Sequence, residues 1–138
     1  MTLNVRKYQQ EDYAAVVDVW RRVFPDDPPH NEPAAMLTAK LGVDDLVFVA
    51  EDHSQVVGAC MAGYDGHRGW LYAVAVLPEA RGTGAGAALV EFAIDALKAL
   101  GCIKVNLQVR AGNTGVIDFY QRLGFAVEDR VSMGKFIG

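Results

Sequence analysis

The fold is decided by residues 69–86, which read GWLYAVAVLPEARGTGAG. The first half is rich in aromatic and β-branched residues, as is typical of a strand. Pro78 ends the strand, since proline has no N–H to donate to a sheet. Glycines at 82, 84 and 86 are followed by an apolar stripe at helical spacing over about 84–100. The stretch therefore predicts a strand, a glycine-rich turn and the N-terminus of a long helix.

The neighbouring segments extend this core into a sheet. Residues 103–110 alternate apolar and polar side chains, which predicts a strand after the helix. A strand–helix–strand connection makes 69–77 and 103–110 parallel. Before them, 46–51 and 56–64 also read as strands, and Asp65-Gly66 predicts a tight hairpin into 69–77.

The outer elements complete the order β-α-α-β-β-β-α-β-α-β-β. In the helix expected over 11–24, Tyr13, Val16, Val17, Trp20 and Phe24 form the apolar face. The others are a strand over 2–8, a helix over 33–41, a helix over 114–123 capped by Asn113, and strands over 125–131 and 133–137. We predict one α/β domain with a mixed sheet (α+β) over residues 1–138.

Composition excludes several classes of protein. The 138 residues are 51% apolar with a net charge of −4, which fits one folded domain rather than a disordered chain. Two cysteines cannot build a disulfide framework, and three scattered histidines without a CxxC predict no metal site. No basic stripe, signal peptide or membrane-length apolar run is present, so we expect a cytoplasmic protein that binds neither nucleic acid nor membrane.

The glycine-rich turn points to a phosphate ligand. Free N–H groups in the first turn of a helix bind anionic oxygens, and glycines let the backbone approach them. Residues 82–87 also match G-x-G-x-x-A, the dinucleotide fingerprint, but residues 78–81 separate them from the strand. The acid that this fingerprint needs about 20 residues later is missing, and so is a P-loop. A dinucleotide-dependent oxidoreductase therefore stays a remote alternative.

The sequence resembles the GNAT family of N-acetyltransferases. Residues 81–86, RGTGAG, match the family's acetyl-CoA signature (Q/R)-x-x-G-x-(G/A). Asn113, Tyr120 and the Leu-Gly-Phe at 123–125 resemble its later N…Y…LGF block, and GYDGHRG at 63–69 resembles the bacterial YpeA-type acetyltransferases. The resemblance implies a single-domain acyl-CoA N-acyltransferase fold in which the parallel strands 69–77 and 103–110 splay apart.

The resemblance also implies a role for each site residue. Acetyl-CoA would be the cosubstrate, with its pyrophosphate on the amides of 82–87 and its pantetheine arm along the strand at 74–76. Tyr120 would be the catalytic acid that protonates the CoA thiolate, since a tyrosine pKa near 10 exceeds a thiol pKa of about 8.5. The residues expected at the cofactor are Val74, Ala75, Val76, Arg81, Gly82, Thr83, Gly84, Ala85, Gly86, Ala87, Asn113 and Tyr120.

Two points stay open at the level of sequence. By helical spacing alone, Tyr120 could be a core aromatic and Asn113 only an N-cap. Gln108 stands where some relatives carry a glutamate base, and an amide accepts no proton at neutral pH. Tyr72, His67 or an acid could then act through water, or the amine could arrive deprotonated. A non-catalytic acyl-CoA-binding or regulatory module is the alternative that this residue raises.

The acceptor is expected to be a primary amine on a small molecule or a peptide. Residues 1–52 hold ten acids and five bases, which mildly favours a cationic amine on that side. Four of the five prolines lie in the loop at 25–33, which we expect to take part in acceptor choice. The sequence does not determine the oligomeric state; a homodimer is one possible assembly, since two-fold dimers are the commonest oligomers.

Overall fold

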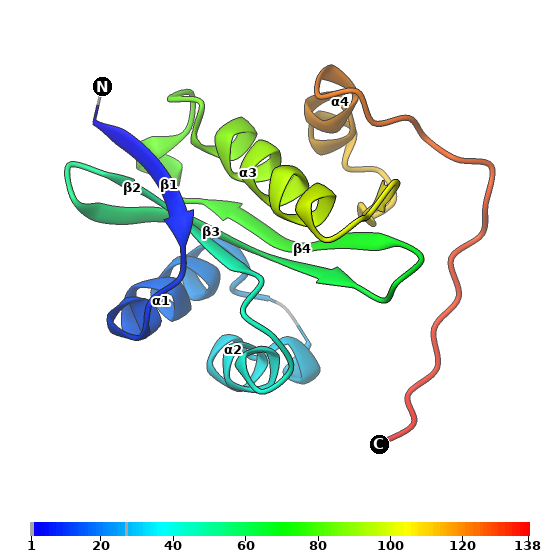
Figure 1. The fold of residues 1–138 in the computed structure, drawn as a ribbon, viewed down its shortest axis with the longest axis horizontal. Helices are drawn as coiled ribbons and strands as arrows, with labels where there is room; N and C mark the ends of the chain where they lie inside the picture. Colours follow the sequence, from blue (N-terminus) through cyan, green and yellow to red (C-terminus); the bar gives the residue numbers. More distant parts are fainter. Residues whose placement is uncertain (1, 27) are drawn as a thin grey trace. The chain divides into compact units, whose positions relative to one another are not determined.

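Five strands form one mixed sheet in the order β1-β2-β3-β4-β5, in a computed structural model that describes residues 2–26 and 28–138 (Figure 1). The first four pair antiparallel and β5 pairs parallel to β4, which confirms the predicted mixed sheet. The strands are β1 (Leu3–Lys7), β2 (Val47–Asp52), β3 (Gln55–Tyr64), β4 (Gly69–Val76) and β5 (Val105–Asn106).

Helices cover both faces of this sheet. One face carries α1 (Tyr13–Val23), and α2 (Pro33–Leu41) packs beside α1; α3 (Ala85–Ala99) covers the other face (Figure 1). Short 3-10 turns precede each of them, at Gln10–Asp12, Pro29–Asn31 and Pro78–Ala80. Trp20 and Leu37 are fully buried against β2 and β3 residues such as Val49, whereas Phe48 points to the opposite side and meets the Phe92 ring edge-on at 5.4 Å. Among the described residues, every helix is too short or too polar to span a bilayer.

Two glycines in the sheet let α3 approach closely. A Cβ placed on Gly58 would lie 2.9 Å from the Ala75 carbonyl oxygen and 3.0 Å from Leu89 Cδ1. At Gly69 it would lie 3.0 Å from Leu97 Cδ1 on α3 and 2.7 Å from the Cys102 sulfur just after that helix. Any larger side chain at either position would push the strand and the helix apart.

The hairpin between β3 and β4 has a longer loop than Asp65-Gly66 predicts. Tyr64 pairs with Gly69, which leaves the four residues 65–68 in the loop. Gly66 has a φ of 89°, and the Asp65 carboxylate accepts the N–H groups of His67 and Arg68, both at 2.7 Å. The turn is thus closed by the Asp65 side chain and also by its backbone N–H, which donates to the Arg68 carbonyl at 3.3 Å.

Strand β5 is much shorter than the alternation over 103–110 predicts. Only Val105 and Asn106 pair with β4, opposite Gly69 and Trp70. Ile103, which should share the buried face with Val105, is 94% exposed. Period-two alternation describes which face a residue would occupy, but a strand forms only where a neighbouring ladder is present.

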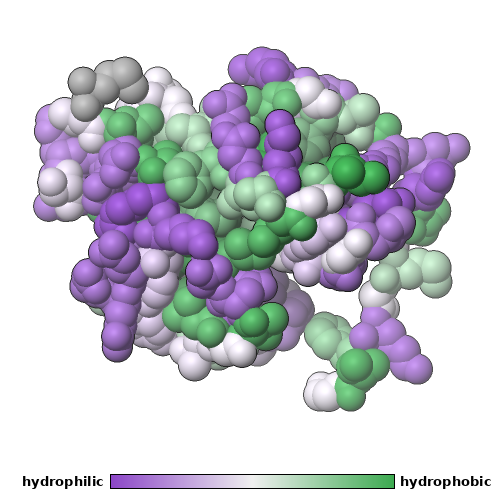
Figure 2. Space-filling model, in the orientation of Figure 1, coloured by the Kyte–Doolittle hydropathy of each residue, from purple (hydrophilic) through white to green (hydrophobic). Residues whose placement is uncertain are grey.

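The chain folds as two compact units, Met1–Leu107 and Gln108–Gly138. The second unit holds α4 (Thr114–Arg122), close to the predicted 114–123, and Gly124 follows with a φ of 95°. The predicted strands at 125–131 and 133–137 are wrong, because the described residues after α4 form no regular secondary structure. Their apolar side chains stay in solvent: Val131, Met133, Phe136 and Ile137 are 76–94% exposed in the extended C-terminal segment (Figure 2).

Candidate active site

The glycine-rich turn opens the N-terminus of α3, as the sequence predicts. Gly82 and Gly84 have φ values of 81° and 89°, a backbone region that favours glycine, and a Cβ on either would meet nothing within 4 Å. The first bond of the helix runs from the Ala88 N–H to the Gly84 carbonyl at 3.0 Å. The preceding N–H groups of Ala85, Gly86 and Ala87 therefore have no acceptor within the helix.

This turn fits an anionic group. Residues 81–84 are exposed, so a ligand can reach the backbone without displacing a side chain. The Thr83 hydroxyl donates to the Ala80 carbonyl at 2.6 Å, which ties the loop to the preceding 3-10 turn. The helix dipole adds positive potential at the same end of α3. The guanidinium of Arg81 lies next to these amides in sequence and is exposed.

The outer edge of β4 offers backbone groups to a second, extended ligand. The Leu77 N–H donates to Val57 on β3 at 2.8 Å, and peptide groups of a strand alternate between its two edges. The N–H and C=O of Val74 and Val76 therefore point away from β3, whereas those of Ala75 point towards it. Within the described residues of 1–107, β5 pairs with β4 only at Gly69 and Trp70, so the edge at Val74 and Val76 carries no strand.

The other two predicted site residues lie in the second unit. The Asn113 side chain accepts the Val116 N–H at 3.3 Å, so it is an N-cap of α4 as its residue type suggests. Tyr120 is 9% exposed, and its ring meets Phe119 and Phe125 edge-on at 5.0 and 5.5 Å. Its ring thus has the aromatic contacts of a core residue, which are compatible with a catalytic hydroxyl. The Gln108 amide donates to the Ser132 hydroxyl.

The residues considered as alternative bases differ in their surroundings. His67 lies on the exposed hairpin loop, where its Nε2 is 3.1 Å from Arg68 Nη1. Tyr72 on β4 is 47% exposed and lies beside Gly63. Partial burial, and then the Asp65 carboxylate, raise the pKa of Tyr72. Its phenol is therefore protonated at neutral pH and suits hydrogen-bond donation better than proton uptake.

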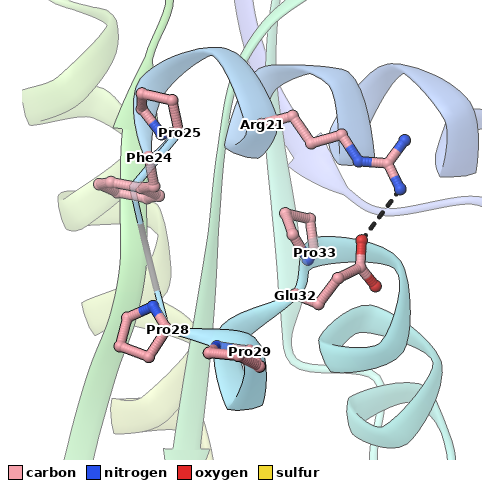
Figure 3. A pocket seen from close by; sticks show the side chains of 7 residues that line it. All are labelled: Arg21, Phe24, Pro25, Pro28, Pro29, Glu32 and Pro33. Atoms are coloured by element: carbon pink, nitrogen blue, oxygen red, sulfur yellow. Dashed lines mark hydrogen bonds and ion pairs between the residues drawn. The ribbon is translucent and has the colours of Figure 1, made fainter.

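The proline-rich loop between α1 and α2 surrounds a hollow of about 320 Å³ (Figure 3). At one rim, Arg21 Nη2 pairs with Glu32 Oε1 at 2.9 Å, and the other Glu32 oxygen accepts the Ala35 N–H. These bonds, chiefly that from Ala35, lower the pKa of Glu32. Asp27 of this loop lies outside the described residues. The hollow is lined by Arg21, Phe24, Pro25, Pro28, Pro29, Glu32 and Pro33.

Comparison with known proteins decides the family. The profile of the acetyltransferase (GNAT) family matches residues 13–125. The chain belongs to the GNAT acetyltransferase family. An acetyltransferase of Pectobacterium atrosepticum is 39% identical to this GNAT chain over 136 residues, which are 96% of this chain and 94% of the relative. The predicted family is confirmed, and so are the predicted enzyme class and cosubstrate, an N-acetyltransferase that uses acetyl-CoA.

Solved structures share the fold of this GNAT chain. The PaiA N-acetyltransferase of Thermoplasma acidophilum, in complex with coenzyme A, has a TM-score of 0.83 at 20% identity. The match covers 95% of this chain and 94% of that one. AAC(6')-Iy, in complex with the bisubstrate analogue CoA-S-monomethyl-acetylneamine, has a TM-score of 0.82 at 19% identity over the full length of both chains. These likenesses confirm the mixed α/β architecture of the GNAT fold.

One feature near the site has no sequence signal. Ala73, in the middle of β4, has a φ of 52° and interrupts the ladder with β3. Its carbonyl accepts a hydrogen bond from the indole of Trp20, which the helical pattern places in the core without any polar role. Alanine is ordinary in a strand, so neither its conformation nor its partner follows from the residue type.

Proposed function

We propose that this protein acetylates a primary amine by direct attack on acetyl-CoA in a ternary complex. The observation that carries the proposal is the pair of left-handed glycines, Gly82 and Gly84, which opens the α3 N-terminus after β4 and the 3-10 turn at Pro78–Ala80. The amides of residues 82–87 would hold the pyrophosphate, with Arg81 on the phosphate side. The edge of β4 at Val74 and Val76 would pair with the pantetheine amides, as a peptide strand would.

The chemical step assigns one residue to the leaving group. The amine nitrogen forms a bond to the thioester carbonyl carbon while the carbonyl oxygen gains charge beside a β4 amide. The C–S bond then breaks and the CoA thiolate takes the Tyr120 phenol proton. The proton that the attacking nitrogen loses passes to water, and the Tyr120 phenolate regains a proton from water. Gln108 cannot accept that proton, since an amide is not a base at neutral pH. Asn113 would offer its side-chain amide to the cofactor beside its capping bond.

The acceptor is proposed to enter along the α1–α2 loop. Four prolines and Phe24 give that hollow an apolar wall, and the Glu32 carboxylate, paired with Arg21, lies at its rim. This combination suits an amine on an apolar or polyfunctional body. The CoA-S-monomethyl-acetylneamine complex of AAC(6')-Iy makes aminoglycosides one class to screen. Polyamines, lysine and peptide N-termini are the others.

The two free cysteines, both buried, support a reducing, cytoplasmic setting.

The test follows thiol release from acetyl-CoA over this panel, with mass spectrometry to detect the acetylated product. Tyr120→Phe keeps the ring contacts with Phe119 and Phe125 but removes the proton donor. We expect its kcat to fall by about 10²-fold or more, with binding of CoA unchanged. Tyr8→Phe, at a tyrosine packed beside the α1-side core, is the matched control and should keep wild-type kcat.

Two results would contradict the proposal. An active Tyr120→Phe enzyme with wild-type kcat would remove Tyr120 from the mechanism. Tight acetyl-CoA binding with no product from any amine would favour a binding module instead.

A further inference from the structure

Strand β4 carries one residue more than β3 can pair with. Ala59 pairs with Ala75, and Met61 pairs with Tyr72, so two steps along β3 correspond to three along β4. The extra residue lies at the turn of the backbone around Ala73, whose φ of 52° is in the left-handed region that L-residues rarely adopt. This is a β-bulge, a device that re-aims the backbone and occurs next to active sites.

A single side chain from the opposite layer holds the bulge. The Trp20 indole Nε1 donates to the Ala73 carbonyl at 2.8 Å. Trp20 comes from α1, is fully buried, and belongs to the core cluster that Ala73 itself contacts. A carbonyl turned out of the ladder in the core needs a donor, because an unpaired buried polar group is costly. Trp20 supplies that donor where no strand can.

The bulge decides where the next peptide group points. Before it, the Gly69 N–H donates to the Lys104 carbonyl at 2.9 Å on the β5 side, so the N–H and C=O of Leu71 also point to that edge. After it, the backbone N–H groups of Ala75 and Leu77 point towards β3, so that of Val74 points to the β5 side. If the alternation continued regularly from Leu71, the N–H of Val74 would point towards β3 and be paired there. The extra residue at Ala73 therefore releases the Val74 N–H to the open edge.

We propose that Trp20 is a positioning residue for acetyl transfer. Its indole N–H fixes the Ala73 carbonyl and thereby aims the Val74 N–H at the thioester carbonyl oxygen. This inference rests on the proposed function, since it assumes that acetyl-CoA lies along β4. The alternative is that Trp20 only fills the core, as its complete burial would also explain.

The experiment separates the two roles with variants that change packing and hydrogen bonding differently. Trp20→Phe keeps an aromatic ring in the core but removes the donor to Ala73. Val16→Ala, on the same helix and also fully buried, removes packing without touching Ala73's carbonyl. Both should lower the melting temperature. Only Trp20→Phe should lower kcat per folded molecule, by about tenfold or more, because small misplacements of reacting groups cost up to 10²-fold. Its KM for acetyl-CoA should change little.

An NMR titration reads the geometry without requiring turnover. In the wild type and in Val16→Ala, the Val74 amide resonance should move when acetyl-CoA is added. In Trp20→Phe that response should shrink or split, whereas the Gly82 and Gly84 amides should respond as in the wild type. Ala73→Gly adopts a positive φ without strain, so adding it to Trp20→Phe should restore part of the kcat and of the Val74 response. If Trp20→Phe alone is unfolded, the double variant is compared with Ala73→Gly.

The outcomes separate this inference from the proposed function. A Trp20→Phe enzyme with wild-type kcat and a wild-type Val74 response would overturn the positioning role. So would a Val74 amide that ignores acetyl-CoA in an active wild-type enzyme. A wild type that binds acetyl-CoA but acetylates no amine would refute the proposed function, and the Val74 response would still decide the role of Trp20.

Discussion

At the residue scale, one buried carboxylate ties the start of the chain together. Asp12, 5% exposed, accepts two bonds from the Arg6 guanidinium at 2.8 and 3.0 Å and one from the Gln9 N–H at 2.8 Å. Arg6 lies on β1, and Asp12 directly precedes α1. The bidentate pair therefore fixes how the first helix leaves the first strand. Glu51 on β2, 3.3 Å from Arg6, adds a third member to the network.

This network predicts an acid-sensitive contribution to stability. The bonds from Arg6 lower the pKa of Asp12 below its value of about 4 in an unfolded chain. Because the pKa of Asp12 is lower in the folded state, the ionised carboxylate contributes to the free energy of unfolding above about pH 4. That contribution is lost as the pH falls through the lower, folded-state pKa. Asp12→Asn should therefore reduce the free energy of unfolding by about 2–3 kcal/mol at pH 7, and the difference should shrink below pH 4. Urea denaturation between pH 7 and pH 2 measures it.

The surface pair of Lys7 and Asp45 provides the control. Their side chains are 52% and 76% exposed at an N–O distance of 3.0 Å. Asp45→Asn should change the free energy of unfolding by less than about 1 kcal/mol, because exposed pairs gain little from each other. Equal losses in the two variants, or an Asp12→Asn difference that does not depend on pH, would contradict the role given to Asp12.

At the scale of elements, the contact between β3 and α3 depends on one missing side chain. Gly58→Ala would place a methyl group 2.9 Å from a backbone oxygen and 3.0 Å from Leu89, so the strand or helix must shift. We expect a loss of about 1–3 kcal/mol in the free energy of unfolding. Gly63→Ala, on the same strand, would meet only Tyr72 Cε2 at 3.6 Å and should be tolerated. Urea denaturation of both variants measures the difference, and equal stability would disprove the tight fit at Gly58.

The elements also show what local pattern can and cannot predict. The boundaries of α2 and α3 follow from Pro33 and from the glycines at 84 and 101, so sequence predicts them within a residue. The glycine-rich turn before α3 likewise follows from Gly82 and Gly84. The bulge at Ala73 does not, because it depends on Trp20, 53 residues away in sequence. The alternation over 103–110 likewise predicts a strand, but only two residues find a ladder on β4.

At the scale of the whole molecule, the residues after α4 should be the least protected part of the chain. Residues 126–138 form no ladder or helix, and most of their side chains are exposed. Their amides should exchange with deuterium far faster than those of α3, where Leu89, Ala93 and Leu97 are fully buried. Hydrogen exchange read by mass spectrometry compares the two segments in one sample, so α3 serves as the internal control.

The same measurement tests why this segment forms neither of the two predicted strands. A strand without a partner gains no hydrogen bonds against its entropy loss. We therefore expect fast exchange at every protein concentration. Slow exchange over 125–131 and 133–137 at low concentration would mean that the chain supplies the missing ladder itself. Protection that appears only as concentration rises would mean that a second copy supplies it, which would make the C-terminal segment the contact of a homodimer.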